Sequence, residues 1–195
     1  MARSRAKHTQ SSVLRIIGGQ WRGRKIPFHP APGLRPTSDR VRETLFNWLA
    51  ADVHGARCVD LFAGTGALGL EALSRGAAHC TFVEPNASTL AGIAAALRTL
   101  DAESMAQVTP GPAAAFCDQA PGPFDILFID PPFAAGLVEG CCQEIEAHGL
   151  VADGAAIYVE MSGRDDAPVV PQRWTLWRDK QAGEVAYRLY RAGEA

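Results

Sequence analysis

The spacing of apolar and polar residues changes along this chain and separates an N-terminal segment from a longer remainder. In the N-terminal segment, residues 13–17 and 20–26 are strand-like runs on either side of a glycine pair, so they predict a β-hairpin. Four prolines in residues 27–36 indicate an extended loop. Residues 1–12 are polar and basic, without an apolar pattern, and we expect them to form a disordered tail.

A helix is predicted directly after the proline-rich loop. Thr37 or Ser38 can cap its first turn, and the carboxylate of Asp39 suits the positive end of the helix dipole. One apolar face recurs at helical spacing in Val41, Leu45, Trp48 and Leu49. We expect the hairpin, loop and helix to form an N-terminal extension, residues 13–50.

From residue 57 onward, short apolar runs alternate with amphipathic ones. Strands are predicted near residues 57–61, 79–83, 105–109, 124–129 and 155–160, and helices near 66–75, 87–100 and 134–148. The strand runs are continuously apolar, which is typical of parallel strands covered on both faces. The pattern therefore predicts an α/β fold with a doubly wound, mostly parallel sheet in residues 51–195.

The C-terminal residues depart from this alternation. Residues 174–177 and 185–190 flank the turn sequence Gln181-Ala182-Gly183 and predict an antiparallel hairpin. The hairpin adds two strands at one edge and gives an expected total of seven.

Composition is that of an ordinary globular protein, with 47% hydrophobic and 21% charged residues. No apolar run approaches the roughly 20 residues of a membrane span, and we expect a cytoplasmic monomer. The five cysteines include no Cys-x-x-Cys pair and are expected to be reduced, buried thiols. No histidine lies at metal-ligand spacing from another ligand, so no metal site is expected.

Charge is distributed unevenly along the chain. Residues 1–50 carry ten Lys or Arg against two Asp or Glu, a net charge of +8, whereas the remainder carries −10 within the total of −2. A basic extension on an acidic domain predicts contact with a polyanion. The alternative is that these basic side chains are only solvated.

A nucleotide-type cofactor is indicated by Gly64, Gly66 and Gly69, which follow a predicted strand and begin a predicted helix. Their spacing matches the glycine fingerprint that brings backbone close to a ligand. Glu84 lies twenty residues after Gly64, at the end of the next strand, where its carboxylate can accept hydrogen bonds from both hydroxyls of an adenosine ribose.

Asp60 favours S-adenosylmethionine over NAD as this cofactor. NAD would place a pyrophosphate at the glycine turn, where a nearby carboxylate is unfavourable. S-adenosylmethionine carries a sulfonium and an ammonium, which a carboxylate attracts directly or through water. Alternatively, Asp60 only shapes the loop by hydrogen bonding, which suits the same cofactor.

The tetrapeptide Asp130-Pro131-Pro132-Phe133 follows a predicted strand, at the edge of the sheet where ligands bind. The Asp130 carboxylate and the Pro131 carbonyl can each accept one N–H of an exocyclic amine and so direct the nitrogen lone pair at a methyl carbon. Phe133 offers a stacking face, and stacking contributes about 1–3 kcal/mol per base. The motif predicts methylation of an amine on a planar base.

With these motifs in place, the sequence resembles the Rossmann-like class I methyltransferases, and within them the RsmD family of 16S rRNA guanine-N2 methyltransferases. The resemblance rests on residues 15–19 with 23–25, 35–46, 60–66, 130–133 and 185–190. It implies the class I methyltransferase fold with an N-terminal extension. It also implies 16S ribosomal RNA, or an assembling small ribosomal subunit, as the substrate.

The resemblance and the motifs together predict three groups of site residues. The catalytic group is Asp130, Pro131, Pro132 and Phe133. S-adenosyl-L-methionine would be held by Asp60, Phe62, Ala63, Gly64, Thr65, Gly66, Glu84, Pro85, Pro112 and Ala113. RNA phosphates would be held by Arg15, Arg22, Arg24, Lys25, Arg35, Arg40 and Arg42, while Trp21 would stack or pack. Many relatives have Asp or Asn where this chain has Pro112, so we expect the Ala113 N–H to hold the adenine.

Three other functions remain open at this point. The chain would be an N6-adenine methyltransferase on DNA or RNA if the amine belongs to adenine, because the tetrapeptide alone does not select guanine. It would be a nicotinamide-dependent oxidoreductase if the glycine loop binds NAD, although Asp60 argues against this. It would be a non-catalytic RNA-binding assembly factor if Asp130 has no chemical role.

Overall fold

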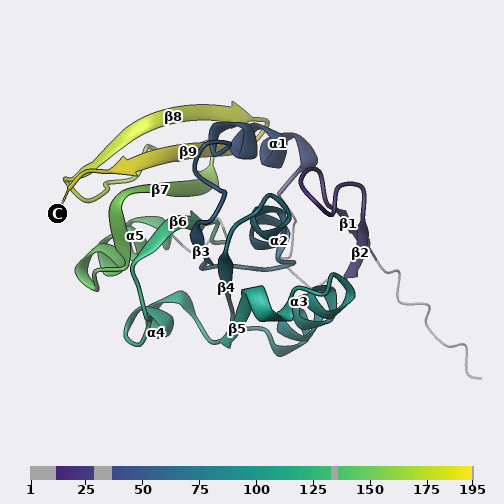
Figure 1. Ribbon diagram of the computed structural model, residues 1–195. Helices are drawn as coiled ribbons and strands as arrows, with labels where there is room; N and C mark the ends of the chain where they lie inside the picture. The colour runs from purple at the N-terminus through teal and green to yellow at the C-terminus, as the bar shows by residue number, and fades with distance from the viewer. Residues whose placement is uncertain (1–11, 29–36, 133–135, 195) are drawn as a thin grey trace, which may run out of the picture.

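The computed structural model of the protein describes residues 12–28, 37–132 and 136–194. Within these ranges, seven strands form one sheet: β3 (Arg57–Asp60), β4 (His79–Glu84), β5 (Ala106–Pro110), β6 (Phe124–Ile129), β7 (Val151–Ser162), β8 (Trp174–Ala182) and β9 (Val185–Ala192). Their order across the sheet is β5-β4-β3-β6-β7-β9-β8 (Figure 1). The first five strands are parallel to one another, whereas β9 pairs antiparallel with β7 and β8. The predicted α/β fold with an antiparallel C-terminal hairpin is confirmed.

Helices cover both faces of this sheet. One face carries α1 (Asp39–Trp48), α2 (Ala67–Ser74) and α3 (Ala87–Thr99), and the other carries α4 (Ala113–Cys117) and α5 (Val138–Ala147) (Figure 1). A short 3-10 turn, η1 (Glu103–Met105), precedes β5. Neither η1 nor α4 was expected, because three and five residues are too few for a helical period to be recognised. Each face has its own cluster of buried apolar side chains.

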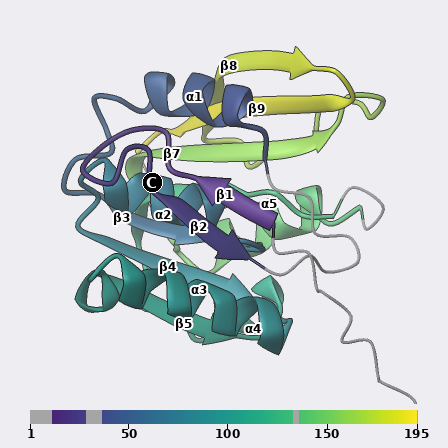
Figure 2. The ribbon, with the colours of Figure 1, turned by 90° about the vertical axis from the view of Figure 1, so that its right-hand side faces the viewer.

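The N-terminal extension contains a smaller two-stranded sheet, β1 (Ser12–Arg15) paired antiparallel with β2 (Lys25–Phe28). Ser12, expected in the disordered tail, is the first residue of β1. The remaining eleven residues of that tail, together with Arg35 and Phe133, lie outside the described residues. Figure 2 shows the two strands over α2 and close to α3.

The predicted hairpin forms, but its second strand is Lys25–Phe28 and not residues 20–26, because residues 17–21 bond to α2 instead of to a neighbouring strand. The backbone N–H groups of Ile17 and Gly18 donate to the carboxylate of Glu71, at 2.9 and 2.7 Å. The N–H groups of Gln20 and Trp21 donate to the carbonyl and the hydroxyl of Ser74. These bonds use the donors that a longer hairpin would need.

The extension packs onto the rest of the protein through a shared core. Leu14, Ile16 and Trp21 are buried in the same apolar cluster as the inner faces of α1, α2 and the sheet. Trp21 is 8% exposed, so this side chain packs in the core and does not offer a face to RNA. The extension therefore holds a fixed position next to α2.

Arg42 has a structural role, and the prediction that it contacts a phosphate is wrong. Its side chain is 1% exposed, and its guanidinium donates to the Arg15 carbonyl at 3.0 Å, the Thr37 carbonyl at 3.3 Å and the Asp39 carboxylate at 2.6 Å. It also lies 3.5 Å from the carboxylate of Glu71, which is fully buried. A guanidinium held on several sides by protein groups is not presented to a polyanion.

Replacing Arg42 with Met should destabilise the protein strongly, because Glu71 would lose a buried cationic partner. Removing one partner of a buried ion pair costs about 3–5 kcal/mol. Arg40→Met, on the exposed side of the same helix, should change the free energy of unfolding by about 0.5 kcal/mol or less. Urea denaturation measures both variants. Equal, small effects of the two substitutions would contradict the structural role of Arg42.

Candidate active site

Three carboxylates meet at one edge of the sheet. Asp60 ends β3, Glu84 ends β4 and Asp130 directly follows β6, and these three parallel strands are neighbours. Because parallel strands end at the same edge, residues that are far apart in the sequence come together there. The predicted cofactor and catalytic motifs are therefore side by side.

The glycine loop joins β3 to α2 and is tied to the end of β4. Gly64 and Gly66 have φ angles of +51° and +77°, a backbone region that favours glycine. The Ala63 N–H donates to the Val83 carbonyl at 3.0 Å, and the Gly64 N–H donates to the Glu84 carboxylate at 3.0 Å. The loop therefore has a defined shape before any ligand binds.

Gly69 allows α2 to lie close to β4. A Cβ at this position would be 2.3 Å from Cε1 of Phe82 and 2.8 Å from the Sγ of Cys80, which is closer than side chains approach one another. The third glycine of the motif is thus required for helix–strand packing, and the first two shape the loop.

The structure shows one of the two roles considered for Asp60, that of shaping the glycine loop. Its Oδ2 accepts a hydrogen bond from the Gly69 N–H at 3.2 Å and so shapes the loop. Its Oδ1 is buried and has no hydrogen-bond partner among the described residues. Burial raises the pKa of Asp60 to about 7, and the charges of Asp130 and Glu84 raise it further, whereas the backbone N–H groups of Gly69 and Phe62 lower it. A buried acceptor left without a donor costs about 1–3 kcal/mol, so a cationic or N–H-bearing ligand fits here.

Glu84 lies where a ribose would be recognised. Its two carboxylate oxygens accept from the N–H groups of Gly64 and Asn86, at 3.0 and 2.8 Å. A carboxylate oxygen can accept more than one hydrogen bond, so each oxygen retains acceptor capacity for a hydroxyl. These bonds hold the carboxylate in place for such a ligand.

The loop after β5 is next to Glu84, as the cofactor prediction requires. The Gly111 N–H donates to the Glu84 carbonyl at 3.3 Å. Pro112 is exposed and precedes α4, and Ala113 is the first residue of that helix. The first N–H groups of a helix have no partner within it, so the Ala113 N–H is suited to an adenine ring nitrogen.

The other predicted cofactor residues differ in exposure. Phe62 and Gly64 are half-buried, Ala63, Thr65 and Gly66 are buried, and Pro85 is exposed. Thr65 faces a small cleft whose other walls include Leu14, Ile26 and Phe28 of the extension. The extension therefore forms part of the surroundings of the glycine loop.

Asp130 is held by Thr37, which the sequence indicated only as a candidate helix cap. The hydroxyl of Thr37 donates to Oδ2 of Asp130 at 3.1 Å. Ser38 is the residue that caps α1, because its Oγ accepts from the Val41 N–H. Burial raises the pKa of Asp130 to about 6, and the Thr37 hydrogen bond opposes that rise.

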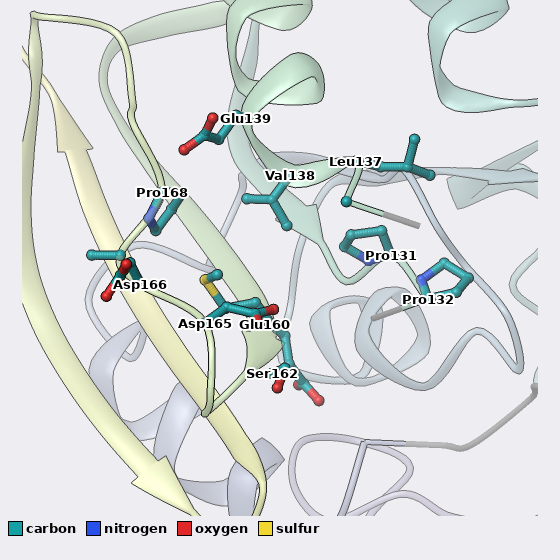
Figure 3. Close-up of a pocket in the computed structure, with 13 residues that line it drawn as sticks. Pro131, Pro132, Leu137, Val138, Glu139, Glu160, Ser162, Asp165, Asp166 and Pro168 are labelled. Carbon is teal, nitrogen blue, oxygen red and sulfur yellow. The ribbon is translucent and has the colours of Figure 1, made fainter. Parts of the chain in front are cut away.

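A cavity of about 320 Å³ opens beside Pro131 and Pro132 (Figure 3). Its other walls come from the start of α5, the end of β7 and the segment after β7. Four carboxylates line it, those of Glu139, Glu160, Asp165 and Asp166, and no Lys, Arg or His does so in the described part of the chain. The sequence contained no signal for this cavity, because its walls join only after folding.

Five of the seven predicted RNA-binding side chains lie on the surface of the extension. They are Arg15, Arg22, Arg24, Lys25 and Arg40. Arg15 pairs with Asp39 at 2.9 Å, and Arg24 donates to the Thr99 carbonyl at the end of α3. Their contact with RNA remains a prediction.

The five cysteines are free thiols; all are buried except the half-buried Cys141, and burial raises the pKa of Cys58. The described residues contain no group of three or more His, Cys, Asp or Glu placed to hold a metal ion. None of the described helices is long and apolar enough to cross a membrane.

The sequence of this chain is similar to those of known proteins. A family model described as "Conserved hypothetical protein 95" matches residues 14–191. The chain is 52% identical to the "Ribosomal RNA small subunit methyltransferase D" of Escherichia coli strain K12, over 94% of this chain and 92% of that protein.

Solved structures resemble this protein as well. The Escherichia coli protein yhhF superposes with a TM-score of 0.88 at 48% identity, covering 93% of this chain and 99% of that one. The structure of SMU.776 complexed with SAH has the same fold, with a TM-score of 0.73 at 13% identity, and covers 98% of this chain and 58% of that one.

Gly69→Ala should destabilise the protein by about 1–3 kcal/mol, because the added methyl group would force Phe82 and Cys80 apart. Gly92→Ala is the matched control: this glycine lies inside α3, and a Cβ there meets nothing within 4 Å. The Gly92→Ala substitution should leave the free energy of unfolding unchanged or raise it by up to about 1 kcal/mol. Thermal unfolding compares the two, and a Gly69 variant as stable as the wild type would contradict the packing role.

Ionised Asp130 should be required for methyl transfer, because both of its oxygens must accept a hydrogen bond, one from the Thr37 hydroxyl and one from the amine. Its pKa is raised to about 6, so the single-turnover rate at saturating substrates should fall as the pH drops through about 6. Asp130→Asn should lower the rate about 100-fold, and the rate of this variant should no longer fall as the pH drops through about 6. A rate that is constant from pH 8 to pH 5 in the wild type would contradict the assignment.

Proposed function

This chain belongs to the RsmD family of methyltransferases, and we propose that it transfers a methyl group from S-adenosyl-L-methionine to the exocyclic N2 of a guanine in 16S ribosomal RNA. The observation that carries the proposal is the meeting of Asp130 and Pro131 with Asp60 and Glu84 at one edge of the sheet. The name of the 52% identical relative from Escherichia coli supports ribosomal RNA as the substrate.

The residues present fit S-adenosylmethionine. Glu84 would accept hydrogen bonds from the ribose hydroxyls, and the Ala113 N–H would donate to the adenine. The partnerless Oδ1 of Asp60 would attract the positively charged methionine part, directly or through water. When bound, this cofactor supplies an electrophilic methyl carbon attached to a sulfonium.

Asp130 and Pro131 would prepare the acceptor amine. The Asp130 carboxylate and the Pro131 carbonyl each accept one N–H, which draws the nitrogen toward tetrahedral geometry and directs its lone pair. Asp130 would then face a methylated nitrogen with a positive charge, because the electron pair of the carbon–sulfur bond would stay with the cofactor. Asp130 would accept the proton of that nitrogen or pass it to water.

The acidic cavity next to Pro131 supports guanine over adenine. The Watson–Crick edge of guanine presents an N–H donor at N1 beside the N2 amine, whereas adenine presents an unprotonated N1 there. Ionised carboxylates only accept hydrogen bonds, so a pocket lined by Glu160 and Asp165 suits guanine and disfavours the N1 of adenine. The base would leave its RNA helix to enter this pocket.

The extension would hold the RNA backbone. Arg15, Arg22, Arg24, Lys25 and Arg40 offer surface cations for phosphates, and the rest of the chain is acidic overall. The substrate would be the free 16S RNA or an assembling small subunit in the cytoplasm. Every group that the proposal uses comes from one chain, so a monomer suffices.

A methylation assay tests the proposal. The protein is incubated with labelled S-adenosylmethionine and either unmodified 16S RNA or small subunits that lack the modification, and the RNA is digested to nucleosides. We expect the label in N2-methylguanosine. Label in N6-methyladenosine would contradict the choice of guanine, and no transfer to either substrate by folded protein would contradict the function.

Two controls separate this function from its alternatives. Asp130→Ala should abolish transfer while RNA binding is retained, whereas an RNA-binding assembly factor without catalysis would show no transfer in the wild type. S-adenosylhomocysteine should bind in calorimetry, and tight binding of NADH in its place would favour an oxidoreductase.

A further inference from the structure

Thr37 brings the N-terminal extension into direct contact with the active-site carboxylate. It lies at the junction between the proline-rich loop and α1, 93 residues before Asp130 in the sequence. Its side chain is buried, at 7% exposure, and its hydroxyl donates to Oδ2 of Asp130 at 3.1 Å. The Thr37 hydroxyl therefore contacts the carboxylate that would orient the acceptor amine.

The position of Thr37 is itself fixed by a buried charge. The Nε of Arg42 donates to the Thr37 carbonyl, and the same guanidinium holds the Arg15 carbonyl and pairs with Glu71. Because Arg42 and Glu71 are buried, the backbone of Thr37 is held relative to α2. The backbone that carries the Thr37 hydroxyl is therefore fixed where this hydroxyl contacts Asp130.

We propose that Thr37 is a positioning residue for methyl transfer, holding one oxygen of Asp130 so that the remaining acceptor capacity of the carboxylate is directed at the amine. This inference rests on the proposed function. An aspartate carboxylate has a broad, roughly two-fold torsional preference, and one fixed oxygen reduces that freedom. Orientation before reaction lowers the barrier without adding affinity for the substrate.

Three substitutions at Thr37 separate the hydroxyl from the methyl group. Thr37→Val keeps the branched shape and removes the hydroxyl, Thr37→Ser keeps the hydroxyl, and Thr37→Ala removes both. Thr44→Val in α1 is the matched control, because the Thr44 hydroxyl bonds to the Arg40 carbonyl of its own helix and to no other group in the described part of the chain.

We expect loss of the Thr37 hydroxyl to lower kcat and to leave KM nearly unchanged. Thr37→Val should lower kcat by about ten- to a hundredfold, the effect of losing one hydrogen bond to a charged group. KM for RNA and for S-adenosylmethionine should stay within about twofold, because positioning does not add ground-state binding. Thr37→Ser should retain kcat within about threefold, and Thr44→Val should match the wild type.

Each other outcome overturns the inference. A Thr37→Val enzyme with normal kcat would show that the hydroxyl is dispensable, and a raised KM for RNA with normal kcat would make Thr37 a docking residue. If Thr37→Val does not fold, the Ser and Ala variants serve as the pair, and equal kcat values in them would reject the proposal. Absence of transfer by the wild type and Thr44→Val would instead reject the proposed function itself.

Discussion

The carboxylate of Glu71, which is fully buried, accepts four hydrogen bonds: two from the backbone after β1, one from Arg42 in α1 and one from Arg75 at the end of α2. A buried charge without such partners would cost several kcal/mol, so the extension must be in place for α2 to be stable in this form. The same helix begins in the glycine loop. One electrostatic constraint therefore fixes the extension and the cofactor loop relative to each other.

This constraint extends to the catalytic motif. Arg42 connects Glu71 to the backbone of Thr37, and the hydroxyl of Thr37 reaches Asp130. The extension that carries the surface cations is thus also a wall of the active site. Under the proposed function, the surface cations of the extension would hold a polyanion while the adjoining site receives a single base.

The sequence was informative wherever function depends on a local motif. Glycine spacing located the cofactor loop, and a carboxylate after each of three apolar strands located Asp60, Glu84 and Asp130 at one edge of the sheet. The roles of Arg42 and Thr37 escaped prediction because their partners are distant in sequence, 93 residues in the case of Thr37. The acidic cavity was not predicted for the same reason, because its walls come from β7, the segment after β7, α5, and Pro131 with Pro132.

The central claim is that Asp60, Glu84 and Asp130 form one site for S-adenosylmethionine and an amine. A crystal structure of the protein with S-adenosylhomocysteine tests it most directly. We expect the ribose hydroxyls within hydrogen-bond distance of the Glu84 carboxylate and a sulfur atom that faces Asp130. A ligand bound away from the glycine loop, or a sulfur turned away from Asp130, would contradict it.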